Sequence, residues 1–220
     1  VHELEPELRN SALHVVRLAG HPRPPGVGDD VEHFRRPAAD VQRAERAELQ
    51  AADVDAVLLT HAHLDHSGYL PLLHRQGFRG RIHATPATCD LCAILLPDSG
   101  HIQEEDAAFL NRHGYSKHTP ALPLYSKHDA IVSLNLLHPE VIGKTFSPIP
   151  GWKATFSSAG HILGAASILL EVAGRRILFS GDLGRPDDLI MKAPDLPPEA
   201  DTVLIESTYG NRTHPQEDVL

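Results

Sequence analysis

Short apolar runs alternate with polar, helix-forming stretches along the chain from residue 54 onward. The first run, Val54–Thr60, is almost continuously apolar, which is typical of a strand buried on both faces. The last run, Thr202–Glu206, has the same character and is also predicted to be a buried strand. Further runs predict strands over Arg81–Ala84, Lys144–Ile149, Trp152–Ser158, Ser167–Val172 and Arg176–Ser180.

Helical segments are predicted between these strands, mostly in the first half of the chain. The expected helices are Ser67–His74, Pro86–Leu96, Gln103–Arg112 and Ser126–Leu137. Pro86 suits the first turn of a helix, and Gly114 follows the end of the third. Strands mixed with helices of this length predict a layered α/β domain.

Residues 1–52 have a different composition. They contain no Lys, Ile, Thr, Tyr, Trp, Met or Cys, and Pro22, Pro24 and Pro25 interrupt any regular element. Only Ala38–Gln50 has a helical pattern, and its apolar stripe is thin. This composition favours a weakly packed, disordered or non-native leader over a binding arm, so a domain boundary is expected near residue 52.

Composition and charge exclude several classes of function. The chain has 220 residues, of which 41% are hydrophobic, and its net charge is −9. This charge argues against nucleic-acid or anionic-membrane binding by the whole surface, although metal ions can supply local positive charge. No apolar run approaches the length of a membrane span. The two cysteines, Cys89 and Cys92, form no disulfide framework, so we expect a cytoplasmic protein in which both are small buried side chains.

Sixteen histidines direct attention to metal chemistry, since they outnumber the eleven Phe, Tyr and Trp residues together. The sequence Thr60-His-Ala-His-Leu-Asp-His66 follows the first buried strand. Alternate residues of an extended chain point the same way, so His61 and His63 can converge on one ion. Asp65 and His66 follow as the chain turns into a helix and can face a second ion. Imidazole and carboxylate are ligands of Zn²⁺, so a metal site is favoured over an ordinary surface loop.

Two further ligand candidates follow later strands. His161 lies between Gly160 and Gly164, after the predicted strand that ends at Ser158. Asp182 follows Gly181, after the predicted strand that ends at Ser180. Each alone is an unremarkable loop residue, but a carboxylate can bridge two cations. The remaining histidines with no linking spacing are expected to be solvated or hydrogen-bonded; they are His74, His83, His101, His113, His118, His128 and His138.

The three sequences that carry these candidates, Thr60–His66, Ala159–Gly164 and Ser180–Gly184, resemble motifs of the metallo-β-lactamase superfamily. The sequence Glu206-Ser-Thr-Tyr-Gly210 is similar to the β-CASP branch of metal-dependent nucleases, and the resemblance covers about Val54–Pro215. It implies an α/β fold of the αββα four-layer sandwich type, here incomplete. The implied organisation is a leader over 1–52, a metal-binding domain over 53–205, and the start of a β-CASP domain over 206–220.

The resemblance also implies a role for each site residue. His61, His63 and His161 would bind a first zinc, Asp65 and His66 a second, and Asp182 would bridge both. Asp65 and Asp182 would also be catalytic, and Glu206 would be an acidic residue that positions a proton donor. The implied function is a zinc-dependent ribonuclease that cleaves RNA phosphodiester bonds with a hydroxide activated by two zinc ions. DNA is the alternative substrate, no membrane partner is expected, and a homodimer is one assembly to test.

Departures from the family pattern lead to further expectations. Family members begin with strands that residues 1–52 lack, and their last zinc ligand and proton donor follow the β-CASP domain. We therefore expect about one tightly held zinc and weak or no nuclease activity from this chain alone. Two alternatives stay open: another hydrolase on the same fold, acting on a thioester or a lactam, and an inactive fragment.

Overall fold

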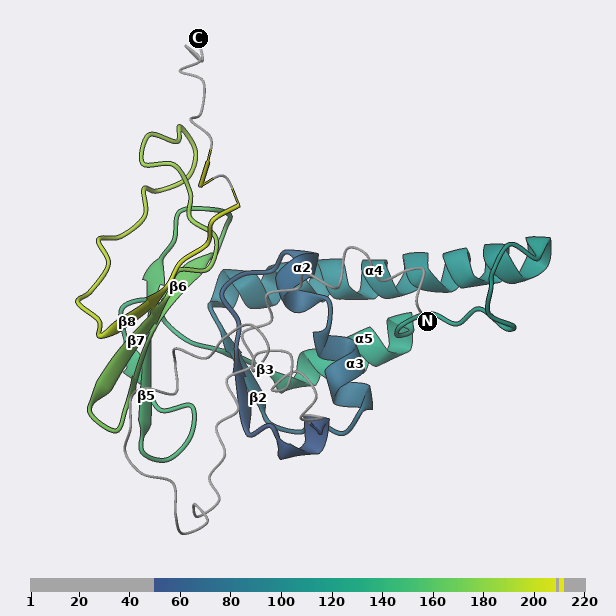
Figure 1. Cartoon of the computed structure of the whole chain (residues 1–220), viewed down its shortest axis with the longest axis horizontal. Coiled ribbons are helices and arrows are strands. Elements are labelled where there is room, and N and C mark those ends of the chain that lie inside the picture. The colour runs from purple at the N-terminus through teal and green to yellow at the C-terminus, as the bar shows by residue number, and fades with distance from the viewer. Residues whose placement is uncertain (1–49, 209, 212–220) are drawn as a thin grey trace.

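The computed structural model describes residues 50–208, 210 and 211 (Figure 1). The leader predicted over 1–52, with its helix Ala38–Gln50, therefore lies almost entirely outside the described residues. At the start of the described part, a short 3-10 helix, η3 (Ala51–Asp53), leads into the first strand. Within the described residues, no helix is both long and apolar enough to cross a lipid bilayer.

The first sheet is parallel and carries the helices. Its strands are ordered β1-β2-β3, and they are β1 (Ala56–Leu58), β2 (Arg81–Ala84) and β3 (Leu137–Pro139). The connections between them contain α2 (Leu64–Ser67), α3 (Leu70–Arg75), α4 (Pro86–His113), α5 (Lys127–Ser133) and the 3-10 helix η4 (Leu134–Leu136). All three residues of β1 are buried, as the apolar run predicts.

The second sheet has five strands in the order β4-β5-β6-β7-β8. They are β4 (Thr145–Phe146), β5 (Trp152–Ser158), β6 (Ala166–Val172), β7 (Arg175–Phe179) and β8 (Thr202–Leu204). Neighbouring strands are antiparallel except β7 and β8, which run parallel.

Two apolar cores hold these layers together. One lies between the helices and the first sheet and includes Leu70, Phe78 and Leu96. The other lies between the sheets, where Leu58 of β1 packs with residues of the second sheet such as Phe156 and Ile168. Figure 1 shows the helices on one side of the first sheet and the second sheet on the other. The described residues thus form three layers, α, β and β, of the expected four-layer sandwich.

The sheets are joined by the backbone at one end. The amide of Ala166, at the start of β6, donates a hydrogen bond of 2.9 Å to the carbonyl oxygen of Thr60, just beyond β1. This link brings the segment that follows β1 against the second sheet. It therefore fixes the place where side chains from both sheets can meet.

Helix α4 differs from the sequence prediction, because it is one helix where two were expected. Pro97 lies inside it, directly after the predicted end of the first helix, although proline lacks the amide proton that continues a helix. Tertiary packing explains the continuity. Gly100 lies so close to the backbone of Ser126 and Lys127 that an added Cβ would be 2.8–2.9 Å from their atoms. Asn111 then pairs with both backbone groups of Ala121.

Three smaller differences concern helix and strand limits. The predicted helix Ser67–His74 is interrupted at Gly68, between α2 and α3. The predicted helix Ser126–Leu137 ends at Ser133, and the chain then forms η4 and the unpredicted strand β3. The last strand was predicted to be buried, but all three residues of β8 are exposed, because it is an edge strand of the second sheet.

Candidate metal centre

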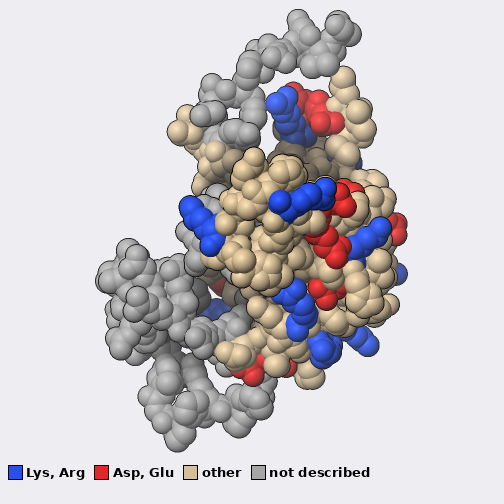
Figure 2. All heavy atoms as spheres, turned by 90° about the vertical axis from the view of Figure 1, so that its right-hand side faces the viewer, with Lys and Arg blue, Asp and Glu red and all other residues tan. Residues whose placement is uncertain are grey.

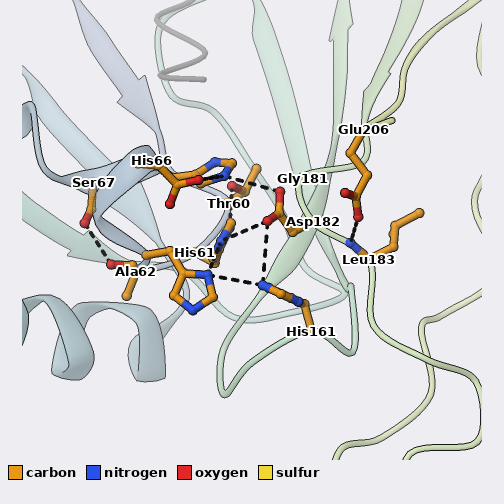
Figure 3. Close-up of polar contacts among 12 residues, drawn as sticks. Thr60, His61, Ala62, His66, Ser67, His161, Gly181, Asp182, Leu183 and Glu206 are labelled. Carbon is orange, nitrogen blue, oxygen red and sulfur yellow. Dashed lines mark hydrogen bonds and ion pairs between the residues drawn. The ribbon is translucent and has the colours of Figure 1, made fainter. Parts of the chain in front are cut away.

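Four side chains from three loops meet at the end where the sheets are joined. His61 and His63 lie between β1 and α2, His161 follows β5, and Asp182 follows β7. One ligand atom from each of these four residues lies within 4.8 Å of the others. Figure 3 shows His61, His161 and Asp182 pointing toward one another from different elements. The structure therefore brings together the side chains that were expected to bind a first zinc.

The distances suit a single cation. Nδ1 of His63 lies 3.1 Å from Nε2 of His61 and 3.2 Å from Nε2 of His161. Oδ2 of Asp182 lies 3.8 Å from Nε2 of His61 and 3.6 Å from Nε2 of His161. Ligand atoms about 2.0–2.2 Å from a tetrahedral ion are separated by roughly 3.3–3.6 Å. Three imidazoles and one carboxylate therefore fit a four-coordinate borderline cation such as Zn²⁺.

A neighbouring hydroxyl orients the most buried of these rings. His61 is completely buried, and its Nδ1 lies 3.1 Å from Oγ1 of Thr60. When Nδ1–H donates to this hydroxyl, the lone pair of Nε2 faces His63 and Asp182, as a ligand requires. No role was predicted for Thr60 from the sequence. Its position directly before the first histidine was the available signal.

A second group of donors adjoins the first. Nε2 of His66 lies 3.3 Å from Oδ1 of Asp182 and 3.4 Å from Oδ2 of Asp65. Asp182 thus turns one oxygen toward each group, as a bridging carboxylate would. Nδ1 of His66 is buried and has no hydrogen-bond partner. The predicted second-zinc ligands are therefore also adjacent, with three donor residues among the described part of the chain.

Burial and charge set the protonation of the centre. Burial, reinforced by the nearby His66, lowers the pKa of His61 to about 3. Burial and His161 likewise lower the pKa of His63. Burial also acts to lower the pKa of His66, but the hydrogen bond and charge of Asp182 outweigh it and the pKa is raised. The same hydrogen bond lowers the pKa of Asp182. His61 and His63 are thus neutral and ready to bind a cation, whereas His66 and Asp182 form an ion pair that a cation must replace.

Glycines allow the ligand loops to pack backbone against backbone. A Cβ on Gly184 would collide with the carbonyl oxygen of Gly160, and the amide of Gly184 donates to the carbonyl oxygen of Ala159 at 2.8 Å. Gly181 has a φ of 56° and lies against the side chain of Thr60. The loops that carry His161 and Asp182 are therefore held in direct contact.

Glu206 lies next to the centre without joining the ligand clusters. Its Oε1 accepts a hydrogen bond of 2.7 Å from the amide of Leu183 (Figure 3). Its own amide donates to Oγ of Ser180. It thereby supports the loop that holds Asp182. Its predicted role with a proton donor stays a prediction.

Two cavities adjoin the centre. A cavity of about 420 Å³ is lined by His66, Asp182 and Glu206, among others, so it opens beside the second group of donors. A larger, mostly apolar cavity of about 970 Å³ reaches His63 and Asp65 at one end. Both give a substrate or solvent access to the predicted ligands.

Comparison with known proteins agrees with this geometry. The family model described as the metallo-beta-lactamase superfamily matches residues 25–213. Ribonuclease TTHA0252 of Thermus thermophilus is 39% identical over 162 residues, which cover 74% of this chain and 33% of the relative. Endoribonuclease YSH1 of Saccharomyces cerevisiae is 34% identical over 169 residues, which cover 76% of this chain and 21% of the relative. The chain thus spans about a third or less of the length of these relatives.

Among solved structures, a metallo-beta-lactamase of Cronobacter sakazakii with a HARLDQ motif is 20% identical to this chain. The similarity has a TM-score of 0.43 and covers 66% of this chain and 48% of that one. The family match spans most of the chain and includes every ligand candidate. The chain therefore belongs to the metallo-beta-lactamase superfamily.

Proposed function

We propose that this chain carries the metal centre of a zinc-dependent ribonuclease of the β-CASP type. The observation that supports it best is the convergence of His61, His63, His161 and Asp182 within 4.8 Å. The substrate class comes from the similarity to proteins named as a ribonuclease and an endoribonuclease. The Glu206–Gly210 sequence supports the same branch.

Each residue has a role in the proposed reaction that follows from its position. His61, His63 and His161 would hold one cation and Asp65 and His66 the other, with Asp182 shared between them. When bound, such a pair of cations supplies an activated water and neutralises charge on the phosphodiester. Asp65 is the more exposed carboxylate, at 55% of its side chain, so it is the ligand best placed to accept a proton from an attacking water. Glu206 keeps the Asp182 loop in position.

The charge distribution supports recognition at the metal centre rather than across the surface. The chain has a net charge of −9. Figure 2 views the molecule from the side that carries the helices. On this face, basic and acidic side chains of the described residues are interspersed. A phosphate backbone would gain little by binding there. The proposed RNA contact is therefore at the ligand loops and the two adjoining cavities.

A cleavage assay with matched substrates tests the proposal. End-labelled single-stranded RNA and DNA of one sequence, a chromogenic β-lactam and a thioester would be incubated with the zinc-loaded chain. We expect RNA cleavage, however slow, that Asp182→Ala abolishes and that Asp98→Ala, at an exposed site on α4, leaves unchanged. Preferential turnover of the β-lactam or the thioester would contradict a ribonuclease. RNA cleavage that persists in Asp182→Ala would show a contaminating nuclease and would leave the proposal without support.

A further inference from the structure

A second group of side chains whose donor atoms could hold a metal ion lies between β2, β3 and the second sheet, away from the centre described above. It consists of His83, His138 and Glu140, and one ligand atom from each lies within 4.8 Å of the others. It shares no residue with the first centre. His83 was expected to be either solvated or hydrogen-bonded. It is hydrogen-bonded to Glu140 and only 1% exposed.

We propose that His83, His138 and Glu140 form an additional binding site for a borderline divalent cation such as Zn²⁺. Two imidazoles and a carboxylate are a donor set that zinc accepts, with solvent completing the coordination. This inference goes beyond the proposed ribonuclease function and does not depend on it.

The backbone places the three donors before any cation arrives. Strands β2 and β3 are parallel, and His83 pairs in register with His138. Paired residues of neighbouring strands face the same side of a sheet, and residues two apart on one strand do so as well. Glu140 is two residues beyond His138, and its amide continues the ladder by donating to the carbonyl oxygen of Ala84 at 2.8 Å. All three side chains are therefore directed to one side.

The distances resemble those of the first centre. Nδ1 of His83 lies 2.8 Å from Oε1 of Glu140, and Nε2 of His138 lies 3.8 Å from the same oxygen. The corresponding separations among the first four ligands range from 3.1 to 3.8 Å. The rings of His83 and His138 have centroids 5.4 Å apart, close to the 4.9–5.1 Å found among His61, His63 and His161. Small side-chain adjustments would bring the donors to tetrahedral spacing.

The two histidines of the site differ in burial. His83 stacks on Phe146 of the second sheet with centroids 5.1 Å apart, and its Nε2 is buried without a hydrogen-bond partner. In contrast, the side chain of His138 is 43% exposed. A cation can therefore enter from solvent at His138, while His83 is held between the sheets and Glu140 is hydrogen-bonded to it. Binding would connect β2 to β3 at the boundary between the sheets.

The test is a Zn²⁺ titration of the metal-free chain against a chromophoric chelator, with four variants. His138→Ala and Glu140→Gln alter the proposed site, and His128→Ala is a control at an exposed histidine on α5. Asp182→Ala combined with His63→Ala damages the first centre. We expect His138→Ala and Glu140→Gln to lose one bound cation per chain, or to bind it roughly tenfold or more weakly. We expect His128→Ala and the first-centre variant to retain that cation.

A direct readout covers the case in which a variant does not fold. Imidazole ¹⁵N NMR of the unaltered chain would follow His83 and His138 during the titration. We expect zinc to shift a ring nitrogen of both residues at no more than a few equivalents. Unshifted resonances, or an unchanged stoichiometry in both His138→Ala and Glu140→Gln, would overturn the proposal. The three side chains would then be a hydrogen-bonded structural cluster only.

Discussion

The carboxylate of Asp182 lies 3.3 Å from Nε2 of His66, so a loop of the second sheet is paired with helix α2 beside the first sheet. Their hydrogen bond raises the pKa of His66 and lowers that of Asp182, so both residues favour the charged forms of an ion pair. A cation at this position would replace the proton on His66. The ion pair thus links the loop that carries Asp182 to α2.

Replacing Asp182 should weaken metal binding more than replacing any other carboxylate of the chain. Asp182→Asn keeps the shape of the side chain but removes the charge that faces His61, His66 and His161. We expect zinc affinity to fall by about 100-fold or more, since the change removes a direct ligand. Metal analysis after dialysis against a weak chelator measures this. Asp98→Asn is the control, and equal zinc retention in both variants would show that Asp182 is not a ligand.

The metal-free chain should lose stability as the pH falls below about 6.5. The pKa of His61 is lowered to about 3, so the folded chain binds fewer protons than the unfolded chain between these values. The stability from this residue is complete above pH 6.5 and would decline by about 2 kcal/mol between pH 7 and pH 5. The raised pKa of His66 acts in the opposite direction, because its contribution is present below pH 6.5 and lost as the pH rises.

Urea unfolding of the metal-free chain at pH 7 and pH 5 measures this dependence. The His61→Asn variant is the comparison, since it lacks the group that resists protonation. We expect the stability of the variant to change less between the two pH values than that of the unaltered chain. Parallel pH profiles for the two proteins would show that His61 does not drive the effect.

A methyl group on Gly184 should disturb the centre without touching a ligand side chain. Gly184→Ala would force the loop after β7 away from Gly160, and overpacking of this kind costs about 1–3 kcal/mol. We expect both a lower unfolding midpoint and weaker zinc binding. Gly143→Ala is the control, because its φ of 78° strains an alanine although nothing lies within 4 Å of the added Cβ. That variant should lose stability and keep its zinc affinity.

The start of helix α5 should be sensitive to its cap. Oγ of Ser126 accepts a hydrogen bond from the amide of Asp129, whose carboxylate in turn accepts from the amide of Ser126. Ser126→Ala would leave the amide of Asp129 without its acceptor, and we expect a loss of about 1 kcal/mol in urea unfolding. Ser147→Ala, in an exposed loop, should change stability by less than about 0.5 kcal/mol. Similar losses in both variants would argue against the capping box.

The sequence predicted which of these side chains meet more accurately than it predicted the helices, for a physical reason. His61, His63, Asp65 and His66 are close in sequence, so one apolar strand and alternation sufficed to place them. His161 and Asp182 are unremarkable alone, and they became candidates because each follows a predicted strand and completes the set begun by the His61–His66 sequence. The contacts among these groups, and the hydroxyl of Thr60 on His61, depend on the meeting of the two sheets, which local pattern does not contain.

Elements determined by tertiary contact were the ones that differed. Pro97 marks a break by local rules, yet α4 continues because Gly100 packs against the start of α5. Strand β3 has only three residues and ends in Pro139, so it is recognisable only through its pairing with β2. The exposure of β8 likewise follows from its place at the sheet edge rather than from its apolar sequence.

The backbone link between Thr60 and Ala166 has a consequence for how the protein responds to distant substitutions. His61 follows β1 of the first sheet, whereas Asp182 follows β7 of the second sheet. The distance between these two side chains therefore depends on how the two sheets are positioned against each other. A side chain that is lost from the inter-sheet core, such as Phe156 or Ile168, would let the sheets shift relative to each other. A shift of one sheet against the other would therefore change the distances between the candidate ligands, even when the substituted residue lies far from them.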